Sequence, residues 1–306
     1  MQLDSGAVTS GIQRQARTIL TLFSDAIRAW WIDDAPRLGA SLAYYTLFAI
    51  APILLVATAV AGMAFGPEAV RGEIVGQLDH LIGREGARAV QSLLEGAAQG
   101  HSGMLATAFG TAAFIVAATG AFLELQHALN TIWRVKPKPD AALRTFLLDR
   151  VRSFGLVVAV GFLLMVSLAV TAALAALDGW LASRSQSVPW LWNGVSVVTS
   201  FVVTTALFAL LFRVLPDVHL RWRDVTTGAL VTAALFTIGQ QVIGLYLGQS
   251  SMSSSYGAAG SVMILLLWVY YSCQILLLGA EFTRVYAEHR KSTPQPAHFA
   301  AREGER

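Results

Sequence analysis

The sequence predicts an all-α, polytopic integral membrane protein with six transmembrane helices. Hydrophobic residues make up 55% of the 306-residue chain and charged residues only 13%, whereas about 25% is usual in soluble domains. Long uncharged windows also recur along the chain, and about 20 apolar residues in a helix cross a hydrocarbon core of about 30 Å. Because lipid offers no hydrogen-bond partners to the backbone, helices are the expected spanning element.

The N-terminal segment is expected to be helical but not to span the membrane. Residues 1–11 are predicted to be disordered, and residues 12–31 carry apolar side chains at helical spacing with arginines between them. Such a basic amphipathic helix, ending in Trp30 and Trp31, suits the membrane interface. A helix packed on the protein's own bundle is the alternative. The first long apolar run begins after Arg37 and is too long for a signal peptide.

The first predicted span covers residues 39–65 and contains Pro52, which removes a backbone hydrogen bond and is expected to kink the helix. The kink is a candidate hinge, with a static bend as the alternative. Residues 67–100 are more polar and predict two short amphipathic helices that form a hairpin outside the membrane, between spans 1 and 2.

The remaining spans follow from uncharged windows and their flanking charges. The run from 225 to 280 carries no charge over 56 residues, too long for one helix, and the glycine- and serine-rich segment 248–260 divides it. The last window stops at Glu281. Residues 12–290 are thus predicted to form one membrane domain, followed by a disordered cytoplasmic tail over 291–306. Spans 2 to 6 are placed at about 103–125, 153–177, 193–213, 225–247 and 261–280.

The distribution of basic residues predicts the orientation. With six spans, 18 of the 22 lysines and arginines fall in segments on the same side as the two termini. Cytoplasmic segments of membrane proteins are enriched in these residues. Both termini are therefore predicted to be cytoplasmic.

No motif for catalysis or metal binding is visible in the sequence. The six histidines are scattered without ligand spacing, and the single cysteine, Cys273, lies within the last span. Walker, GxGxxG and GxSxG motifs are absent. The sequence therefore predicts no enzyme and no cofactor, although catalytic residues that converge from different helices remain a third, least favoured hypothesis.

Polar side chains in or near the spans are the better functional candidates, because such groups are costly in lipid. The candidates for lining a pathway are Tyr44, Tyr45, Gln240, Gln241 and Gln274, and those for its cytoplasmic mouth are Glu124, Arg134, Glu281 and Arg284. The alternative for the glutamines is hydrogen bonding between helices. For Glu281 and Arg284, which are three residues apart, the alternative is a local ion pair.

Four segments of the chain resemble one bacterial family. SLAYYTLFAIAPILL (41–55), ALNTIWRVKPKP (128–139), LPDVHLRWRDVTTGALV (215–231) and the stretch from 256 to 290 are similar to the YihY/virulence factor BrkB family. The resemblance implies a six-helix inner-membrane protein linked to the cell envelope, for which transport or lipid handling is commonly supposed. An older ribonuclease BN label of that family finds no supporting residues here.

Two main hypotheses for function follow. The first is transport or handling of lipids or other amphipathic molecules through a cavity between helices. The second is a non-catalytic envelope scaffold, with a protein partner bound through residues 67–100. Membrane lipids are the expected partners in either case and nucleic acid is not, since the positive-inside rule already explains the basic loops. Oligomerisation is compatible with both.

Overall fold

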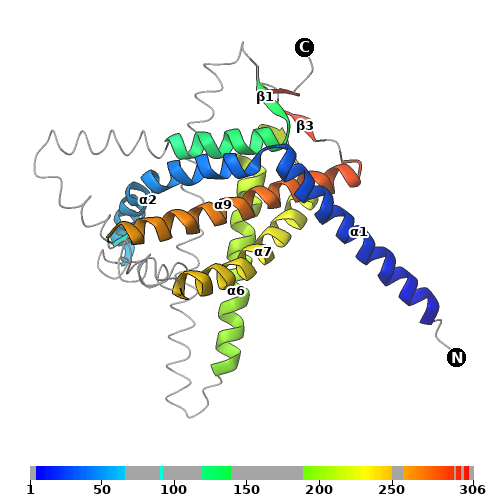
Figure 1. The fold of residues 1–306 in the computed structure, drawn as a ribbon, viewed down its shortest axis with the longest axis horizontal. Helices are drawn as coiled ribbons and strands as arrows, with labels where there is room; N and C mark the ends of the chain where they lie inside the picture. The colour runs from blue at the N-terminus through cyan, green and yellow to red at the C-terminus, as the bar shows by residue number, and fades with distance from the viewer. Residues whose placement is uncertain are drawn as a thin grey trace, which may run out of the picture.

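The computed structural model describes residues 5–65, 90–91, 119–138, 189–249, 258–292, 294–297 and 300–302, and these are mostly helical. Five long helices have defined bounds, and a further helical stretch covers residues 119–132 (Figure 1). Two pairs of very short strands complete the described fold. The long helices are α1 (Ser5–Ile32), α2 (Ala35–Phe65), α6 (Pro189–Val214), α7 (Trp222–Gln249) and α9 (Ala258–His289).

Four predicted spans coincide with long helices, because an uninterrupted apolar run without internal charge favours a helix of that length. Spans 39–65, 193–213, 225–247 and 261–280 lie within α2, α6, α7 and α9. Within the described residues, three helices contain segments long and apolar enough to cross a membrane: Val197–Val214, Trp222–Ile243 and Val262–His289.

Other predictions fall outside the described residues. They are the span 153–177, the span 103–125 up to residue 118, and the hairpin 67–100 apart from the helical pair 90–91. Pro52 lies within the continuous helix α2, but its side chain is outside the described residues, so its role as a hinge stays a prediction.

Helix α1 begins at Ser5, earlier than the predicted start at residue 12, so the prediction of disorder is wrong from Ser5 onward. One side of its C-terminal half packs on α9, where the rings of Phe23 and Phe282 lie 4.9 Å apart. Another side exposes large apolar residues that include Leu20 and Trp31. Figure 1 shows the N-terminal half of α1 projecting away from the other described helices. The helix thus combines a face packed on the bundle with an apolar face that the described residues leave uncovered.

A tight turn connects α1 to α2. Asp34 has a φ of 56°, a left-handed conformation that aspartate tolerates better than most residues. Its carbonyl accepts a hydrogen bond from the amide of Arg37 at 3.0 Å. Pro36 lies in the first turn of α2, where a missing N–H costs nothing. The turn fixes Asp33 at the end of the bundle.

Helix α9 is central, with contacts to α1, α2 and α7. It crosses α7 at two reciprocal glycine–threonine contacts. A Cβ atom at Gly228 would overlap Thr283, and one at Gly279 would overlap Thr232. The two threonine hydroxyls donate to the carbonyls of the glycines on their own helices, at 2.7 Å each. Small residues thus let the two helices approach closely, as in other membrane helix pairs.

The C-terminal segment connects two distant parts of the chain. Strand β4 (Ala300–Arg302) pairs antiparallel with β1 (Val135–Pro137), and β3 (Gln295–Pro296) pairs antiparallel with β2 (Val218–His219). The prediction of a disordered tail is therefore wrong for these residues. Strands of two or three residues are too short to show the alternation of apolar and polar residues by which a strand is recognised in a sequence.

Candidate functional site

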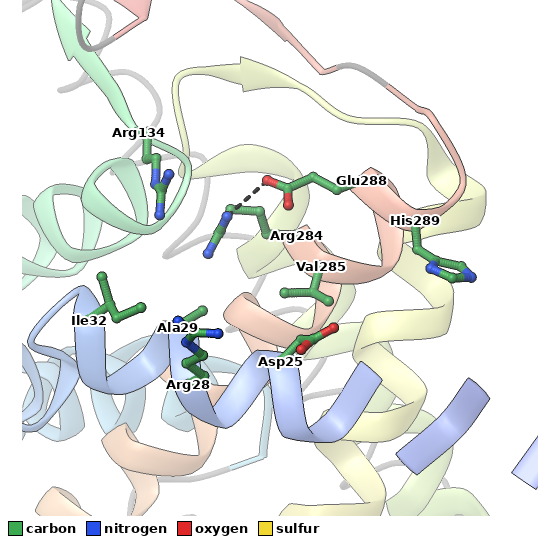
Figure 2. A pocket seen from close by; sticks show the side chains of 9 residues that line it. All are labelled: Asp25, Arg28, Ala29, Ile32, Arg134, Arg284, Val285, Glu288 and His289. Atoms are coloured by element: carbon green, nitrogen blue, oxygen red, sulfur yellow. Dashed lines mark hydrogen bonds and ion pairs between the residues drawn. The ribbon is translucent and has the colours of Figure 1, made fainter. Parts of the chain in front are cut away.

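A pocket of about 310 Å³ opens between α1, α9 and Arg134, which lies just after the helical stretch 119–132 (Figure 2). We call it the α1–α9 pocket. Its wall combines three arginines and two carboxylates with several apolar side chains. The residues that line it are Asp25, Arg28, Ala29, Ile32, Arg134, Arg284, Val285, Glu288 and His289.

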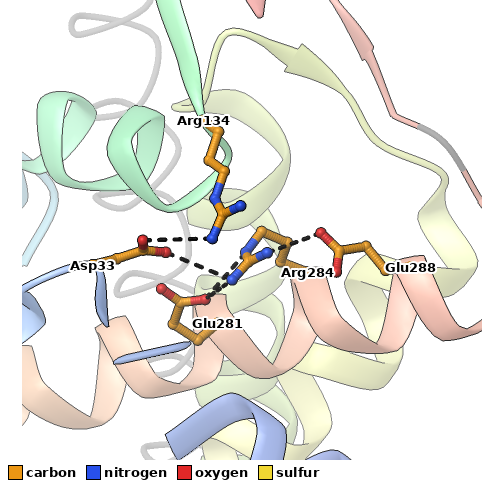
Figure 3. Close-up of polar contacts among 5 residues, drawn as sticks. All are labelled: Asp33, Arg134, Glu281, Arg284 and Glu288. Carbon is orange, nitrogen blue, oxygen red and sulfur yellow. Dashed lines mark hydrogen bonds and ion pairs between the residues drawn. The ribbon is translucent and has the colours of Figure 1, made fainter. Parts of the chain in front are cut away.

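A network of ion pairs adjoins this pocket (Figure 3), and three of its members, Arg134, Arg284 and Glu288, line the pocket. We call Asp33, Arg134, Glu281, Arg284 and Glu288 the charged cluster. Arg284 is its centre: Nη2 lies 2.8 Å from Glu281 Oε2 and 3.6 Å from Asp33 Oδ2, and Nη1 lies 2.8 Å from Glu288 Oε1. Arg134 Nη2 approaches Asp33 Oδ1 at 3.7 Å. Three carboxylates thus surround one guanidinium, and a second guanidinium shares one of them.

Burial divides the charged cluster into an inner and an outer part. The side chain of Glu281 is 0% exposed and that of Arg284 is 7% exposed. Arg284 donates two hydrogen bonds to Glu281 Oε2, from Nε at 3.1 Å and from Nη2 at 2.8 Å. Glu288 and Arg134 are more than half exposed. A buried carboxyl group needs hydrogen-bond partners, and Arg284 donates both of the hydrogen bonds that Glu281 receives.

Local backbone geometry brings the cluster together. Glu281, Arg284 and Glu288 lie three and four residues apart on α9, so they share one helix face. Asp33 is fixed by the turn between α1 and α2. Arg134 follows the helical stretch 119–132 and has a φ of 53°, a conformation that ends the helix and redirects the chain into β1.

A second buried polar group lies beside the short strands. Asp217, before β2, accepts hydrogen bonds from Asn130 Nδ2 at 2.9 Å and from Gln126 Nε2 at 3.4 Å. Its amide donates to Asn130 Oδ1 at 2.8 Å, and its carbonyl accepts from the amide of Ala297 at 2.9 Å. Asp217 therefore connects the helical stretch 119–132 with the C-terminal segment, and this group is structural.

Three of the four residues predicted for the cytoplasmic mouth lie close together in the structure, and their role at a mouth stays a prediction. Arg134, Glu281 and Arg284 lie together in the charged cluster, and the local ion pair that was the alternative for Glu281 and Arg284 is present. Glu124 is half-buried on the helical stretch 119–132 and belongs neither to the charged cluster nor to the lining of the α1–α9 pocket.

The five predicted pathway residues do not line the α1–α9 pocket. Tyr44 and Tyr45 are exposed on α2, with their rings edge to face at 5.8 Å. Gln240 is half-buried and Gln241 exposed on α7. Gln274 of α9 is half-buried and donates a long hydrogen bond of 3.4 Å to the carbonyl of Pro36 in α2. Gln274 thus makes the interhelical contact that was the alternative for the glutamines.

Sequence reasoning missed Asp33 and Glu288 of the charged cluster, and Asp25 and Arg28 of the pocket as site residues. For Glu288 the signal was available, because it lies four residues after Arg284 on the same helix. For Asp33 the adjacent acidic residue and Pro36 indicated only a turn. Among the described residues, no group of three or more His, Cys, Asp and Glu side chains has the arrangement of a metal site.

Comparison with known proteins assigns the chain to a family. The chain matches the virulence factor BrkB family over residues 26–303. It is 32% identical to a UPF0761 membrane protein of Verminephrobacter eiseniae over 287 residues, covering 88% of this chain and 65% of the relative. It is 29% identical to one of Ralstonia nicotianae over 260 residues, covering 83% and 56%. A third relative, from Methylibium petroleiphilum, is 30% identical over 291 residues, with 86% and 65% covered.

The chain therefore spans between about half and two thirds of the length of these relatives. No solved structure matches it. The family match covers the turn that holds Asp33, all of α9 and both strand pairs, and the relatives are named as membrane proteins. This chain is a membrane protein of the virulence factor BrkB family.

Proposed function

We propose that this protein handles lipids or other amphipathic molecules in a bacterial inner membrane, as a multi-pass protein without enzymatic activity. The observation that supports this proposal is the position of the α1–α9 pocket. Its charged wall lies at the end of the apolar helix α9, and its neighbour α1 exposes large apolar side chains. A site that joins charge to exposed apolar surface suits a ligand that has both characters.

We further propose six spans with both termini in the cytoplasm. The contacts support this arrangement, because four segments predicted to be cytoplasmic contact one another. Asp33 at the α1–α2 turn pairs with Arg134 and Arg284, and strands β3 and β4 pair with β2 and β1. A phosphatase reporter that is active only outside the cytoplasm, fused after Arg306, should stay inactive, and an active fusion would reject the arrangement.

The candidate pathway remains part of the proposal, with Gln274 as its most informative residue. It is half-buried between α2 and α9, where a Cβ atom at Gly39 would overlap its side chain. In the proposed pathway, the amide of Gln274, whose hydrogen bond to Pro36 is long, is the polar group that a lipid headgroup contacts between these two helices. Two other pathway candidates, Tyr44 and Tyr45, are exposed on α2, the helix that Gln274 contacts.

The test is reconstitution of the purified protein into liposomes that contain fluorescent phospholipids, with transbilayer movement as the readout. We expect movement above protein-free vesicles, and slower movement for Gln274→Ala. Ser272→Ala is the matched control: it is half-buried on the same helix, and its hydroxyl bonds only to the Trp268 carbonyl of its own helix, at 2.9 Å. A folded, inserted protein that moves no lipid would contradict the proposal and favour the scaffold hypothesis.

A further inference from the structure

We propose that the α1–α9 pocket binds the zwitterionic headgroup of a phospholipid, with the phosphate at its arginines and a primary amine at its carboxylates. This inference rests on the proposed function and gives it a substrate class, of which phosphatidylethanolamine is the simplest member. It follows from the distribution of available charges in the pocket and from the apolar surface that adjoins it.

Two of the three arginines are available to a phosphate. Arg28 is exposed on α1, and within the described part of the chain it makes no ion pair. Arg134 is half exposed, and its contact with Asp33 is long, at 3.7 Å. Arg284 is already held by three carboxylates and forms the inner wall. The planar guanidinium of arginine matches phosphate oxygens by paired hydrogen bonds, so Arg28 and Arg134 form the anionic subsite.

Two carboxylates in the same pocket suit the amine. Asp25 lies three residues before Arg28 on α1 and is exposed, without an ion-pair partner among the described residues. Glu288 is 59% exposed and uses only Oε1 to contact Arg284. Figure 2 shows Asp25 and Glu288 extending into the pocket from the two helices that bound it. An anionic headgroup would meet repulsion from both carboxylates, whereas an ammonium group would pair with them.

The apolar part of the wall distinguishes a lipid from a soluble zwitterion. Ile32, Ala29 and Val285 line the pocket, and Ile27 and Trp31 are exposed at nearby positions of α1. Tryptophan with neighbouring aliphatic residues is typical of the zone between headgroups and acyl chains. A lipid bound by its headgroup would therefore place its glycerol and first acyl carbons on this apolar surface.

The experiment is native mass spectrometry of the full-length protein in detergent, titrated with dioleoyl-phosphatidylethanolamine or dioleoyl-phosphatidylglycerol. We expect the ethanolamine lipid to bind more tightly than the glycerol lipid. Arg28→Gln should weaken both about tenfold, the change expected for loss of one charge-assisted hydrogen bond. Asp25→Asn should weaken only the ethanolamine lipid. Arg17→Gln, an exposed position on the same helix outside the pocket, should bind as the unchanged protein does.

Each alternative outcome overturns the inference. Equal binding of the two lipids by the unchanged protein would contradict the proposed amine subsite. Equal effects of Arg28→Gln and Arg17→Gln would contradict the proposed phosphate subsite. Soluble glycerophosphoethanolamine binding as tightly as the lipid would assign the pocket to a soluble ligand. Both arginines are exposed, so equal thermal unfolding will verify that the variants are folded. Headgroup selectivity without lipid movement in liposomes would reject the proposed function alone, and lipid movement without selectivity would reject this inference alone.

Discussion

Replacement of Arg284 by alanine should lower the free energy of unfolding by about 3–5 kcal/mol, the usual cost of removing one partner from a buried ion pair. The reason is the environment of Glu281, whose side chain is fully buried and receives both of its hydrogen bonds from Arg284. Without the guanidinium, Glu281 and Asp33 would be two neighbouring carboxylates with no buried cation between them. Chemical unfolding of the purified protein in detergent measures the effect.

The chain offers a matched control in Arg37. Arg37 Nε pairs with Asp34 Oδ2 at 3.0 Å, also three residues apart, but the two side chains are 79% and 58% exposed. Exposed pairs contribute about 0–1 kcal/mol, so Arg37→Ala should have little effect. A double change of Arg284→Met and Glu281→Leu should cost less than Arg284→Ala, because it leaves no buried charge unpaired at 281. Equal costs for Arg284→Ala and Arg37→Ala would show that the charged cluster contributes nothing through burial.

Replacement of Asp217 by alanine should have the second large effect, about 2–6 kcal/mol, or about 1–3 kcal/mol for each amide that loses a buried acceptor. The two amides are those of Asn130 and Gln126, which donate to the Asp217 carboxylate. All three side chains are buried. The loss should loosen the connection between the helical stretch 119–132 and the C-terminal segment, and limited proteolysis should then cleave the C-terminal segment faster.

Two further variants test whether the cost of Asp217→Ala comes from lost hydrogen bonds or from lost side-chain volume. Asp217→Asn keeps one acceptor oxygen, so it should cost less than Asp217→Ala. Gln126→Leu combined with Asp217→Ala should recover part of the loss, because it removes one of the two amides that lose the Asp217 carboxylate as an acceptor. If Asp217→Asn and Asp217→Ala unfold at the same denaturant concentration, the carboxylate oxygens are not the acceptors that hold this group together.

These predictions differ in how much of their basis was visible in the sequence. The pair Glu281–Arg284 was given by spacing alone as the alternative to a role at the mouth, because residues three apart on a helix share a face. Asp33 and Arg134 join that pair from positions more than 100 residues away along the chain, and no spacing rule links them. Likewise, no spacing rule links Asp217 to its partners Asn130 and Gln126, which come from the helical stretch 119–132.

The five predicted pathway residues also show what residue type alone does not determine. Tyr44, Tyr45, Gln240, Gln241 and Gln274 were grouped because each is polar within an apolar window. The structure distributes them over α2, α7 and α9, with Tyr44 and Gln241 exposed and Gln274 between two helices. Polarity in a span marks a residue that needs a partner, but the crossing of the helices decides whether that partner is another helix or a ligand.

The sequence by itself determined the membrane class and the positions of the long helices α2, α6, α7 and α9, because transfer of an uncharged run into lipid depends on local composition and length. It also determined the local pair on α9. Only the tertiary structure decided the charged cluster, the α1–α9 pocket and the strand pairs made by the C-terminal segment. These depend on close approach at sites such as Gly228 and Thr283, and on turns at Asp34 and Arg134 that bring distant charges to one end of the bundle.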